Sequence, residues 1–258
     1  MNTIYVVAHK KYNEMDSSLY KTIQVGPKKE LIRSDVICDN TGDNIANKNP
    51  YYCELTALYW MWKNDSTSKY IGLCHYRRFF SKKMFSKKRE NFLTNDDIES
   101  ILKKNDIIIP KRRYMKNTVR NQYWMPNSEC AFEKDYLLLE ELIKEEYPEF
   151  YKEFIRFSEG KSIFYANMFV MRKDLMDEYC SWIFEVLKKM ESRIDMTGYS
   201  VQQQRVYGYL AERLFNVWVI HKNLKTYEEN VCREYMSVWQ EFNDQLRSFI
   251  CKKFFNKE

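Results

Sequence analysis

Short apolar segments typical of buried strands alternate along this chain with longer amphipathic segments typical of helices. Residues 3–8, 70–74 and 106–109 are rich in β-branched or aromatic side chains, and each segment stops at a histidine or a proline. A longer strand is predicted at residues 163–171, and short strands at 23–25 and 217–220. Strands that alternate with helices favour a mostly parallel sheet with helices on both faces, so we expect a doubly wound α/β fold.

Several predicted helices carry start signals. Asn49 suits an N-cap and Pro50 suits the first helical turn, where its missing N–H costs nothing. An apolar stripe at residues 55–62 then follows helical spacing. Thr94 and Asp97 form a capping-box pattern for a helix that runs to residue 104. Further helices are predicted at residues 133–146, 175–191 and 201–215, and in the last twenty residues.

The length of 258 residues fits one large α/β domain. We expect residues 1–220 to form that domain and residues 221–258 to form a C-terminal helical extension, packed on the domain or facing a membrane. Residues 247–257 alternate aromatic or aliphatic side chains with lysines. This pattern suits an anionic membrane surface, and it equally suits a terminal helix that packs against the core.

The lack of a recognisable signal or membrane-spanning segment and the pattern of cysteines favour the cytoplasm. The apolar stretch at residues 4–8 is too short for a signal core, and the uncharged stretch at 162–171 reaches about half of a membrane span. The seven cysteines include no C-x-x-C pair, which argues against a disulfide framework and a zinc site. Free thiols in a reducing compartment are the simpler interpretation.

Positive charge is concentrated in one part of the chain. Residues 77–116 hold 13 Lys/Arg against 5 Asp/Glu, a local charge of +8 in a chain of net charge +6. Such a segment indicates an anionic ligand or surface, unless it is an ordinary solvated lysine-rich face.

Polar residues follow the predicted strands at the edge where parallel sheets bind ligands. His9 ends the first strand, His75 ends the strand at residues 70–74, and the turn-rich loop 39–44 can reach the same edge. Each histidine is either a site residue or an ordinary structural one.

Arg77 and Arg78 come two and three residues after His75. A guanidinium presents a rigid fork that matches diphosphate oxygens. Both arginines can reach one anion if they lie in a loop, whereas they alternate in direction if the strand continues. Surface ion pairs are the other interpretation.

The motifs that the chain lacks exclude several classes of enzyme. It has no G-x-G-x-x-G and no G-x-x-x-x-G-K-[ST], which argues against a dinucleotide-dependent oxidoreductase and a P-loop nucleotidase. It also has no H-E-x-x-H, G-x-S-x-G or D-x-D. Bound phosphate would therefore be held by cationic side chains and helix N-termini.

Three more residues are candidates. Arg205 and Glu212 fall near one face of the helix predicted at residues 201–215, so Glu212 is either a general base or an ion-pair partner of Arg205. Asn167 lies within the apolar stretch 163–171, where a buried amide needs partners in a structural network or on a ligand hydroxyl.

Several segments, as they stand here, resemble one bacterial family. They are residues 5–10 (YVVAHK), 39–45 (DNTGDNI), 52–60 (YCELTALYW), 62–64 (WKN), 70–78 (YIGLCHYRR) and 167–171 (NMFVM), with Asn49 and with Arg205, Gly208 and Glu212 through Leu214. The family is a capsular-polysaccharide and O-antigen glycosyltransferase family formerly known as a domain of unknown function (DUF4422), and its understood members look like galactofuranosyltransferases. The resemblance covers roughly residues 3–220.

The resemblance implies a nucleotide-diphospho-sugar transferase fold of the GT-A type, with residues 1–220 as the glycosyltransferase domain. Residues 75–78 would then stand where relatives carry D-x-D. His75 could still ligate Mn²⁺ or Mg²⁺, or the two arginines could replace the charge of the metal. At residues 124–127, close to where relatives are expected to carry a histidine, this chain has WMPN, so its acceptor recognition is expected to differ.

The resulting hypothesis is transfer of a sugar, galactofuranose, from a UDP-sugar to a lipid-linked or oligosaccharide acceptor in capsule or O-antigen biosynthesis. Arg77 and Arg78 would stabilise the departing diphosphate, Glu212 would deprotonate the acceptor if the reaction inverts, and His75 would lie between donor phosphate and acceptor. The residues expected at the donor are His9, Asp39, Asn44, Asn49, Glu54, Tyr76, Asn167 and Arg205.

Two other classes of function remain open. A nucleic-acid-binding module would use the basic segment and the aromatic residues, but the aromatics fall on apolar stripes and no nucleic-acid motif is present. A non-catalytic scaffold of a polysaccharide assembly complex is the other alternative. The enzyme is expected in the cytoplasm, with peripheral contact at the cytoplasmic face of the inner membrane as a further expectation.

Overall fold

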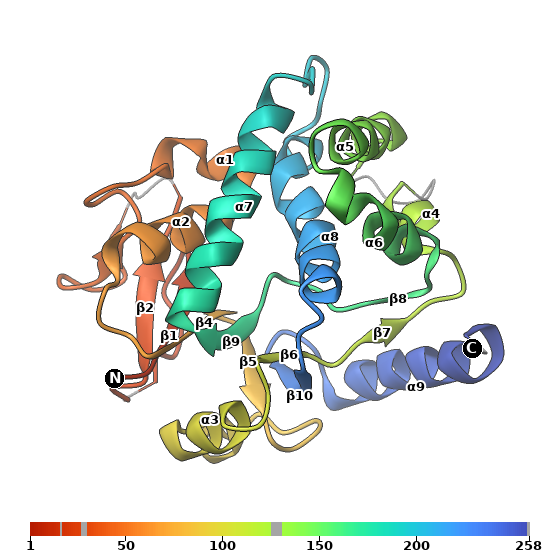
Figure 1. The fold of residues 1–258 in the computed structure, drawn as a ribbon. Coiled ribbons are helices and arrows are strands. Elements are labelled where there is room, and N and C mark those ends of the chain that lie inside the picture. The colour runs from red at the N-terminus through yellow and green to blue at the C-terminus, as the bar shows by residue number, and fades with distance from the viewer. Residues whose placement is uncertain (16, 27–29, 125–130, 257–258) are drawn as a thin grey trace.

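The computed structural model describes residues 1–15, 17–26, 30–124 and 131–256, which form a mixed α/β fold with a helical C-terminal part (Figure 1). The strands are β1 (Thr3–Ala8), β2 (Tyr20–Gln24), β3 (Ile37–Cys38), β4 (Tyr70–His75), β5 (Arg78–Ser81), β6 (Ile107–Pro110), β7 (Arg113–Tyr114), β8 (Ser162–Ile163), β9 (Phe169–Arg172) and β10 (Thr226–Arg233). The α-helices are α1 (Asn49–Tyr52), α2 (Leu55–Asn64), α3 (Asn95–Leu102), α4 (Val119–Tyr123), α5 (Glu133–Glu146), α6 (Pro148–Glu159), α7 (Lys173–Glu191), α8 (Val206–His221) and α9 (Val238–Phe255). Short 3-10 turns occupy Ala46–Lys48, Arg89–Asn91 and Gln203–Arg205.

The main sheet is mixed rather than mostly parallel. Its strand order is β3-β2-β1-β4-β5-β10-β6-β9. The first four strands of that order run parallel, and β6 runs parallel to β10, whereas β5 and β9 run antiparallel to their neighbours. Because β9 pairs with β4 as well as with β6, the strands β4, β5, β10, β6 and β9 close into a ring.

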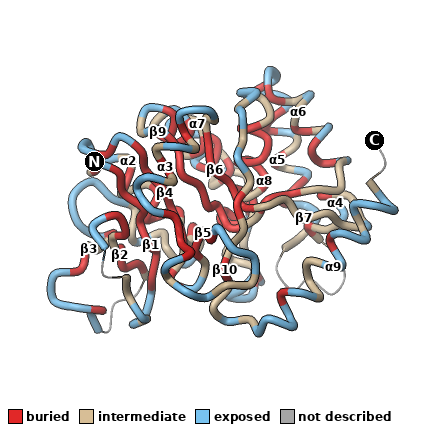
Figure 2. The backbone as a smooth tube through the Cα atoms, turned by 90° about the horizontal axis from the view of Figure 1, so that it is seen from below, coloured by how far each residue is buried: buried red, intermediate tan, exposed pale blue. Residues whose placement is uncertain are grey.

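The sheet is buried on both faces, as a continuous apolar strand predicts. Along β1, Tyr5 and Val7 belong to a large core formed with α2 and α5–α8, while Ile4 and Val6 belong to a smaller core formed with α3. Figure 2 shows the strands as the most buried part of the chain, with the exposed backbone at the periphery. The edge at the carboxyl ends of β1 and β4 is therefore held by a rigid support.

The helix predicted from residue 49 is interrupted. Asn49 is not its N-cap: it lies inside α1, and its side-chain amide donates to the Cys53 carbonyl at 2.9 Å and to Thr56 Oγ1 at 3.0 Å. Cys53 has φ +52°, which ends α1 and lets α2 begin two residues later. The capping box of Thr94 and Asp97 is confirmed.

Two apolar stretches differ from their predictions. Residues 163–171 are not one strand: β8 and β9 are separated by a turn in which Ala166 and Asn167 both have positive φ. Residues 217–220 are not a strand but the last full turn of α8, since a short apolar run fits a buried helix equally well.

The C-terminal segment contains strand β10 in addition to the predicted helix. β10 lies between β5 and β6 in the sheet. The following helix α9 is tied to the sheet by Asp244, which forms ion pairs with Arg113 and Arg233. Within the described ranges, no helix is long and apolar enough to cross a membrane.

Candidate functional site

The site is centred on the two-residue turn between β4 and β5. His75 ends β4, Arg78 begins β5, and the two residues pair across the turn. His75 Nε2 lies 2.7 Å from the Ala166 carbonyl oxygen. Because a carbonyl only accepts, Nε2 carries the proton and the lone pair of the neutral ring stays on Nδ1. Burial, with a smaller contribution from Arg78, lowers the pKa of His75 to about 4, so the ring is neutral at pH 7.

The turn before β9 holds three parts of the site together. Ala166 has φ +78° and Asn167 has φ +49°, backbone conformations that are costly for residues other than glycine. The Ala166 carbonyl accepts from His75, and the Ala166 N–H donates to Glu212 Oε1 at 2.8 Å. The Asn167 amide donates to Glu54 Oε1 at 2.8 Å. This strained turn thus joins β4, α2 and α8.

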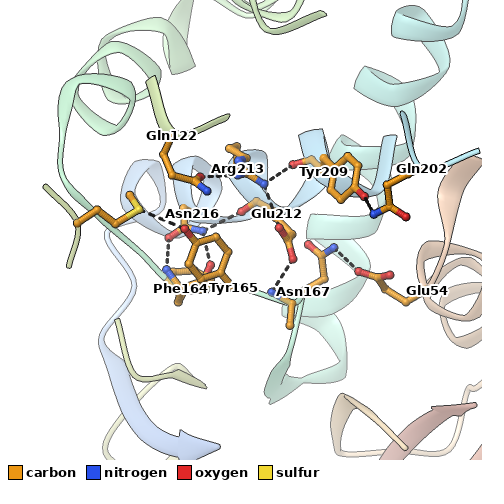
Figure 3. A network of polar contacts seen from close by, with 12 residues as sticks. Glu54, Gln122, Phe164, Tyr165, Asn167, Gln202, Tyr209, Glu212, Arg213 and Asn216 are labelled. Atoms are coloured by element: carbon orange, nitrogen blue, oxygen red, sulfur yellow. Dashed lines mark hydrogen bonds and ion pairs between the residues drawn. The ribbon is translucent and has the colours of Figure 1, made fainter. Parts of the chain in front are cut away.

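Glu212 lies on α8 with its carboxylate largely buried (Figure 3). Its partner is the neighbouring Arg213, at 3.0 Å, and not Arg205, whose Nε donates to Cys53 Sγ at 3.0 Å. Burial raises the pKa of Glu212, and Glu54 adds to the increase, while Arg213 opposes it. A carboxylate of raised pKa is a stronger base than a solvated one.

Arg213 and Asn216 fix the orientation of this part of α8. Arg213 is 5% exposed and donates to the Tyr209 carbonyl and to Gln122. Asn216 holds the backbone of Phe164 from both sides, accepting from its N–H at 3.2 Å and donating to its carbonyl at 2.9 Å. Figure 3 shows this network running from α4 through α8 to the strained turn. No local pattern predicts a role for Asn216, because its partner is a backbone group 52 residues away.

A cavity of about 350 Å³ opens on the Glu212 side of the site. Residues of the sheet, the strained turn and the C-terminal segment form its walls. They are Arg78, Pro110, Lys111, Arg113, Tyr165, Ala166, Met168, Glu212, Val231, Arg233, Tyr235, Asp244 and Gln245. Four cationic side chains face two carboxylates in this lining, so the cavity suits a polar ligand with anionic groups. The contributions of β10 and α9 were not predicted.

Arg77 and Arg78 do not share one pocket. Arg78 lines the cavity, whereas the Arg77 guanidinium lies 4.8 Å from the centre of the Tyr76 ring. Both guanidinium groups lie near the Tyr235 ring, at 5.4 Å and 5.5 Å from its centre. Contact with an aromatic ring helps to fix the position of each arginine.

His9 and Arg205 join Arg77 at a second cationic group of residues. The His9 ring packs edge-on against Tyr76 at 5.1 Å. Partial desolvation lowers the pKa of His9, and the cations Lys10, Arg77 and Arg205 lower it further. Arg205 also contributes, after burial and Arg78, to the lowered pKa of His75. The predicted residues His9, His75, Arg77 and Arg205 therefore lie close enough for the arginines to lower the pKa values of the histidines.

The other predicted donor residues have structural partners nearby. Asp39 is buried and accepts from Thr56 Oγ1 at 2.7 Å, and Thr56 in turn accepts from Asn49. Asn44 is exposed and bonds within its own loop, to the Gly42 carbonyl and the Ala46 N–H. These contacts hold the 39–44 loop against the start of α2.

His75 is the residue predicted as a possible ligand of a divalent metal. Over the part of the chain that the structure describes, no group of three or more His, Cys, Asp or Glu side chains is placed to bind one. The charged neighbours of His75 include Arg78 and Arg205, and the nearby carboxylate of Glu212 is bound to Arg213 and the Ala166 N–H. The predicted acceptor segment at residues 124–127 lies outside the described residues except for Trp124.

The fold is similar to that of a glycosyltransferase. The solved apo structure of the WbbM bifunctional glycosyltransferase superposes with a TM-score of 0.81 at 33% identity, over 89% of this chain and 45% of that one. This chain therefore spans less than half the length of that protein.

A comparison with models of protein families assigns the chain to one of them. The chain belongs to the family described as a domain of unknown function (DUF4422), which matches residues 3–223. No curated protein matches the chain.

Proposed function

We propose that this protein transfers a sugar from a UDP-sugar to a hydroxyl group of a glycan acceptor. The observation that carries the proposal is the position of Glu212. Its largely buried carboxylate lines the cavity and touches the same turn that His75 contacts from the other side. We infer that Glu212 is the base, that His9, Arg77 and Arg205 bind the diphosphate, and that the cavity binds the acceptor.

The donor would lie at the carboxyl ends of β1 and β4, as in a GT-A type fold. Arg77, with His9 and Arg205 nearby, supports binding of the diphosphate, and Arg78 faces the developing charge from the cavity side. Tyr76 and Asn167 would shape the sugar site, and Asp39, Asn44 and Asn49 would hold the loop near the uridine. We propose galactofuranose as the sugar, and cationic side chains in place of a metal held by His75.

In the reaction, the bond between the anomeric carbon and the diphosphate oxygen breaks, and its electron pair leaves with the diphosphate. The acceptor oxygen forms the new bond to that carbon, and its proton passes to Glu212 if the transfer inverts. His75 is neutral, so it adds no positive charge to that of the nearby Arg78. Its Nε2–H donates to the Ala166 carbonyl and so holds the turn that supports Glu212.

We place the reaction in capsule or O-antigen biosynthesis in the cytoplasm, with a lipid-linked or oligosaccharide acceptor. The test is UDP release from UDP-galactofuranose with and without an oligosaccharide acceptor, in the presence of EDTA and of manganese. We expect acceptor-dependent UDP release that EDTA leaves unchanged, and a glycosylated product by mass spectrometry.

Two results would overturn parts of this proposal. Release that requires manganese would contradict the metal-free donor site. No release with any nucleotide sugar, together with polysaccharide output that survives Arg77→Ala in cells, would favour the non-catalytic scaffold.

A further inference from the structure

Helix α9 packs on the protein through polar side chains, while most of its apolar side chains face outward. Glu241 and Ser248 are buried, and they accept from the backbone N–H groups of Arg233 and Tyr114. The outward side chains are between 41% and 68% exposed, and they are Val238, Trp239, Phe242, Leu246, Phe249, Ile250, Phe254 and Phe255. The helix therefore does not bury its apolar residues in the core, which was one interpretation of the C-terminal sequence.

The exposed apolar residues form one continuous stripe. Trp239, Phe242, Leu246, Phe249 and Ile250 follow the spacing i, i+3, i+7, i+10 and i+11, which places them along one side of the helix. Single exposed apolar residues are common on protein surfaces, but a contiguous stripe of this length marks an interaction surface.

Positive charge surrounds this stripe. Arg247, Lys252 and Lys253 of α9 are exposed, whereas the helix's carboxylates Glu241 and Asp244 are directed inward to their partners on the sheet. The outward charge of α9 is therefore positive although the acidic and basic residues of the helix nearly balance.

A loop from the basic segment, residues 82–88, extends this surface. Its Phe85 ring lies 6.3 Å from the Phe242 ring, and Lys87 Nζ donates to the Glu234 carbonyl at 3.3 Å. Lys83, Met84 and Lys88 in the same loop are exposed. Two features that are far apart in the sequence, the basic segment and the C-terminal helix, thus form one apolar and cationic surface.

We propose that α9 and the 82–88 loop dock on the surface of an anionic lipid bilayer. An amphipathic helix with aromatic side chains on one face and flanking lysines binds at the level of the lipid headgroups. A second copy of this chain is a poorer occupant, because it would place two surfaces of the same positive charge against each other. The proposal does not depend on the reaction proposed above.

The geometry links this surface to the cavity. Asp244 and Gln245, on the inward side of α9, line the cavity, so one helix diameter of about 10 Å separates the cavity from the apolar stripe. A protein docked through the stripe would hold the cavity close to the lipid headgroups, where the polar part of a lipid-linked molecule lies.

The test is flotation of the full chain with vesicles of phosphatidylcholine, alone or mixed in equal parts with phosphatidylglycerol. We expect binding to the anionic vesicles that weakens as salt is raised. The variant Trp239→Ser/Phe242→Ser/Phe249→Ser should lower the vesicle partition at least about tenfold. The variant Lys252→Glu/Lys253→Glu should lower it about tenfold on anionic vesicles.

The control is Leu137→Ser, which removes a leucine of similar exposure on α5, far from α9 in Figure 1. It should bind vesicles like the wild type, and thermal unfolding by circular dichroism should be the same for all variants because every changed side chain is exposed. Absence of binding by the wild type to anionic vesicles, or binding by the serine and glutamate variants as strong as that of the wild type, would overturn the proposal. A concentration-dependent dimer that the triple serine variant abolishes would also overturn it and assign the surface to self-association.

Discussion

Replacing His75 by glutamine separates the hydrogen bond of this residue from its charge. The glutamine amide can still donate to the Ala166 carbonyl, as His75 Nε2 does, but it cannot titrate. Any difference in pH dependence between the two proteins therefore reports the protonation of the histidine.

The size of the effect follows from the two pKa values. His75 has a pKa of about 4 in the folded protein, and a histidine in an unfolded chain titrates near 6.5. Between these values the unfolded chain binds a proton that the folded chain does not, so stability is lost as pH falls from about 6.5 towards 4. From pH 7 to pH 5 the loss due to this one residue is about 2 kcal/mol.

Urea unfolding followed by tryptophan fluorescence at pH 7 and pH 5 measures this loss. The free energy of unfolding of the wild type should fall by about 2 kcal/mol more than that of His75→Gln, since the two proteins share all other titrating groups. Equal losses would show that His75 titrates like a histidine in an unfolded chain, and the lowered pKa assigned to it above would be wrong.

Four further substitutions, one of them a matched control, test other parts of the account. Glu212→Gln should lower turnover at least about 100-fold while donor binding persists, because an amide cannot take up the acceptor proton; steady-state kinetics with unchanged turnover would remove Glu212 as the base. Gly72→Ala should destabilise by about 3 kcal/mol in urea unfolding, since its Cβ would lie 2.8 Å from a backbone oxygen of β9. The matched change Gly208→Ala, whose Cβ would have no contact closer than 3.4 Å, should be neutral or stabilising by up to about 1 kcal/mol. Asp244→Asn should cost about 2 kcal/mol and speed proteolysis near α9, because this carboxylate pairs with two arginines; an unchanged cleavage rate would mean that other contacts hold the helix.

Local signals predicted the elements that depend on local interactions. The strand at residues 3–8 and the helix at residues 133–146 have the predicted bounds, and the capping box of Thr94 and Asp97 is present. The strand is marked by a continuous apolar run, the helix by one apolar face, and the capping box by residues within one turn.

Elements that depend on distant partners were not predictable in this way. β10 has the sequence TYEENVCR, too polar for a buried strand, and it is a strand because β5 and β6 supply hydrogen bonds on both sides. The turn at Ala166 and Asn167 interrupts an apolar run, since its positive φ angles depend on contacts with His75, Glu212 and Glu54.

The candidate site also contains residues that local patterns predicted and residues that depend on distant partners. His9, His75 and Arg77 follow predicted strands, and the rule that ligands bind at carboxyl ends of strands was sufficient to select them. Tyr235, Arg233 and Asp244 belong to the C-terminal segment and reach the site only because β10 enters the sheet. No pattern of residue spacing in the sequence relates them to His75.

Calorimetric titration with UDP in the absence of metal tests the central claim most directly. The account predicts that the wild type binds UDP and that Arg77→Gln binds at least about tenfold more weakly, because one diphosphate contact is lost. The control Arg172→Gln changes an exposed arginine that pairs with Asp174, and it should bind UDP like the wild type. Absence of UDP binding by the wild type, or equal binding by Arg77→Gln, would contradict the assignment of this site to a nucleotide-sugar donor.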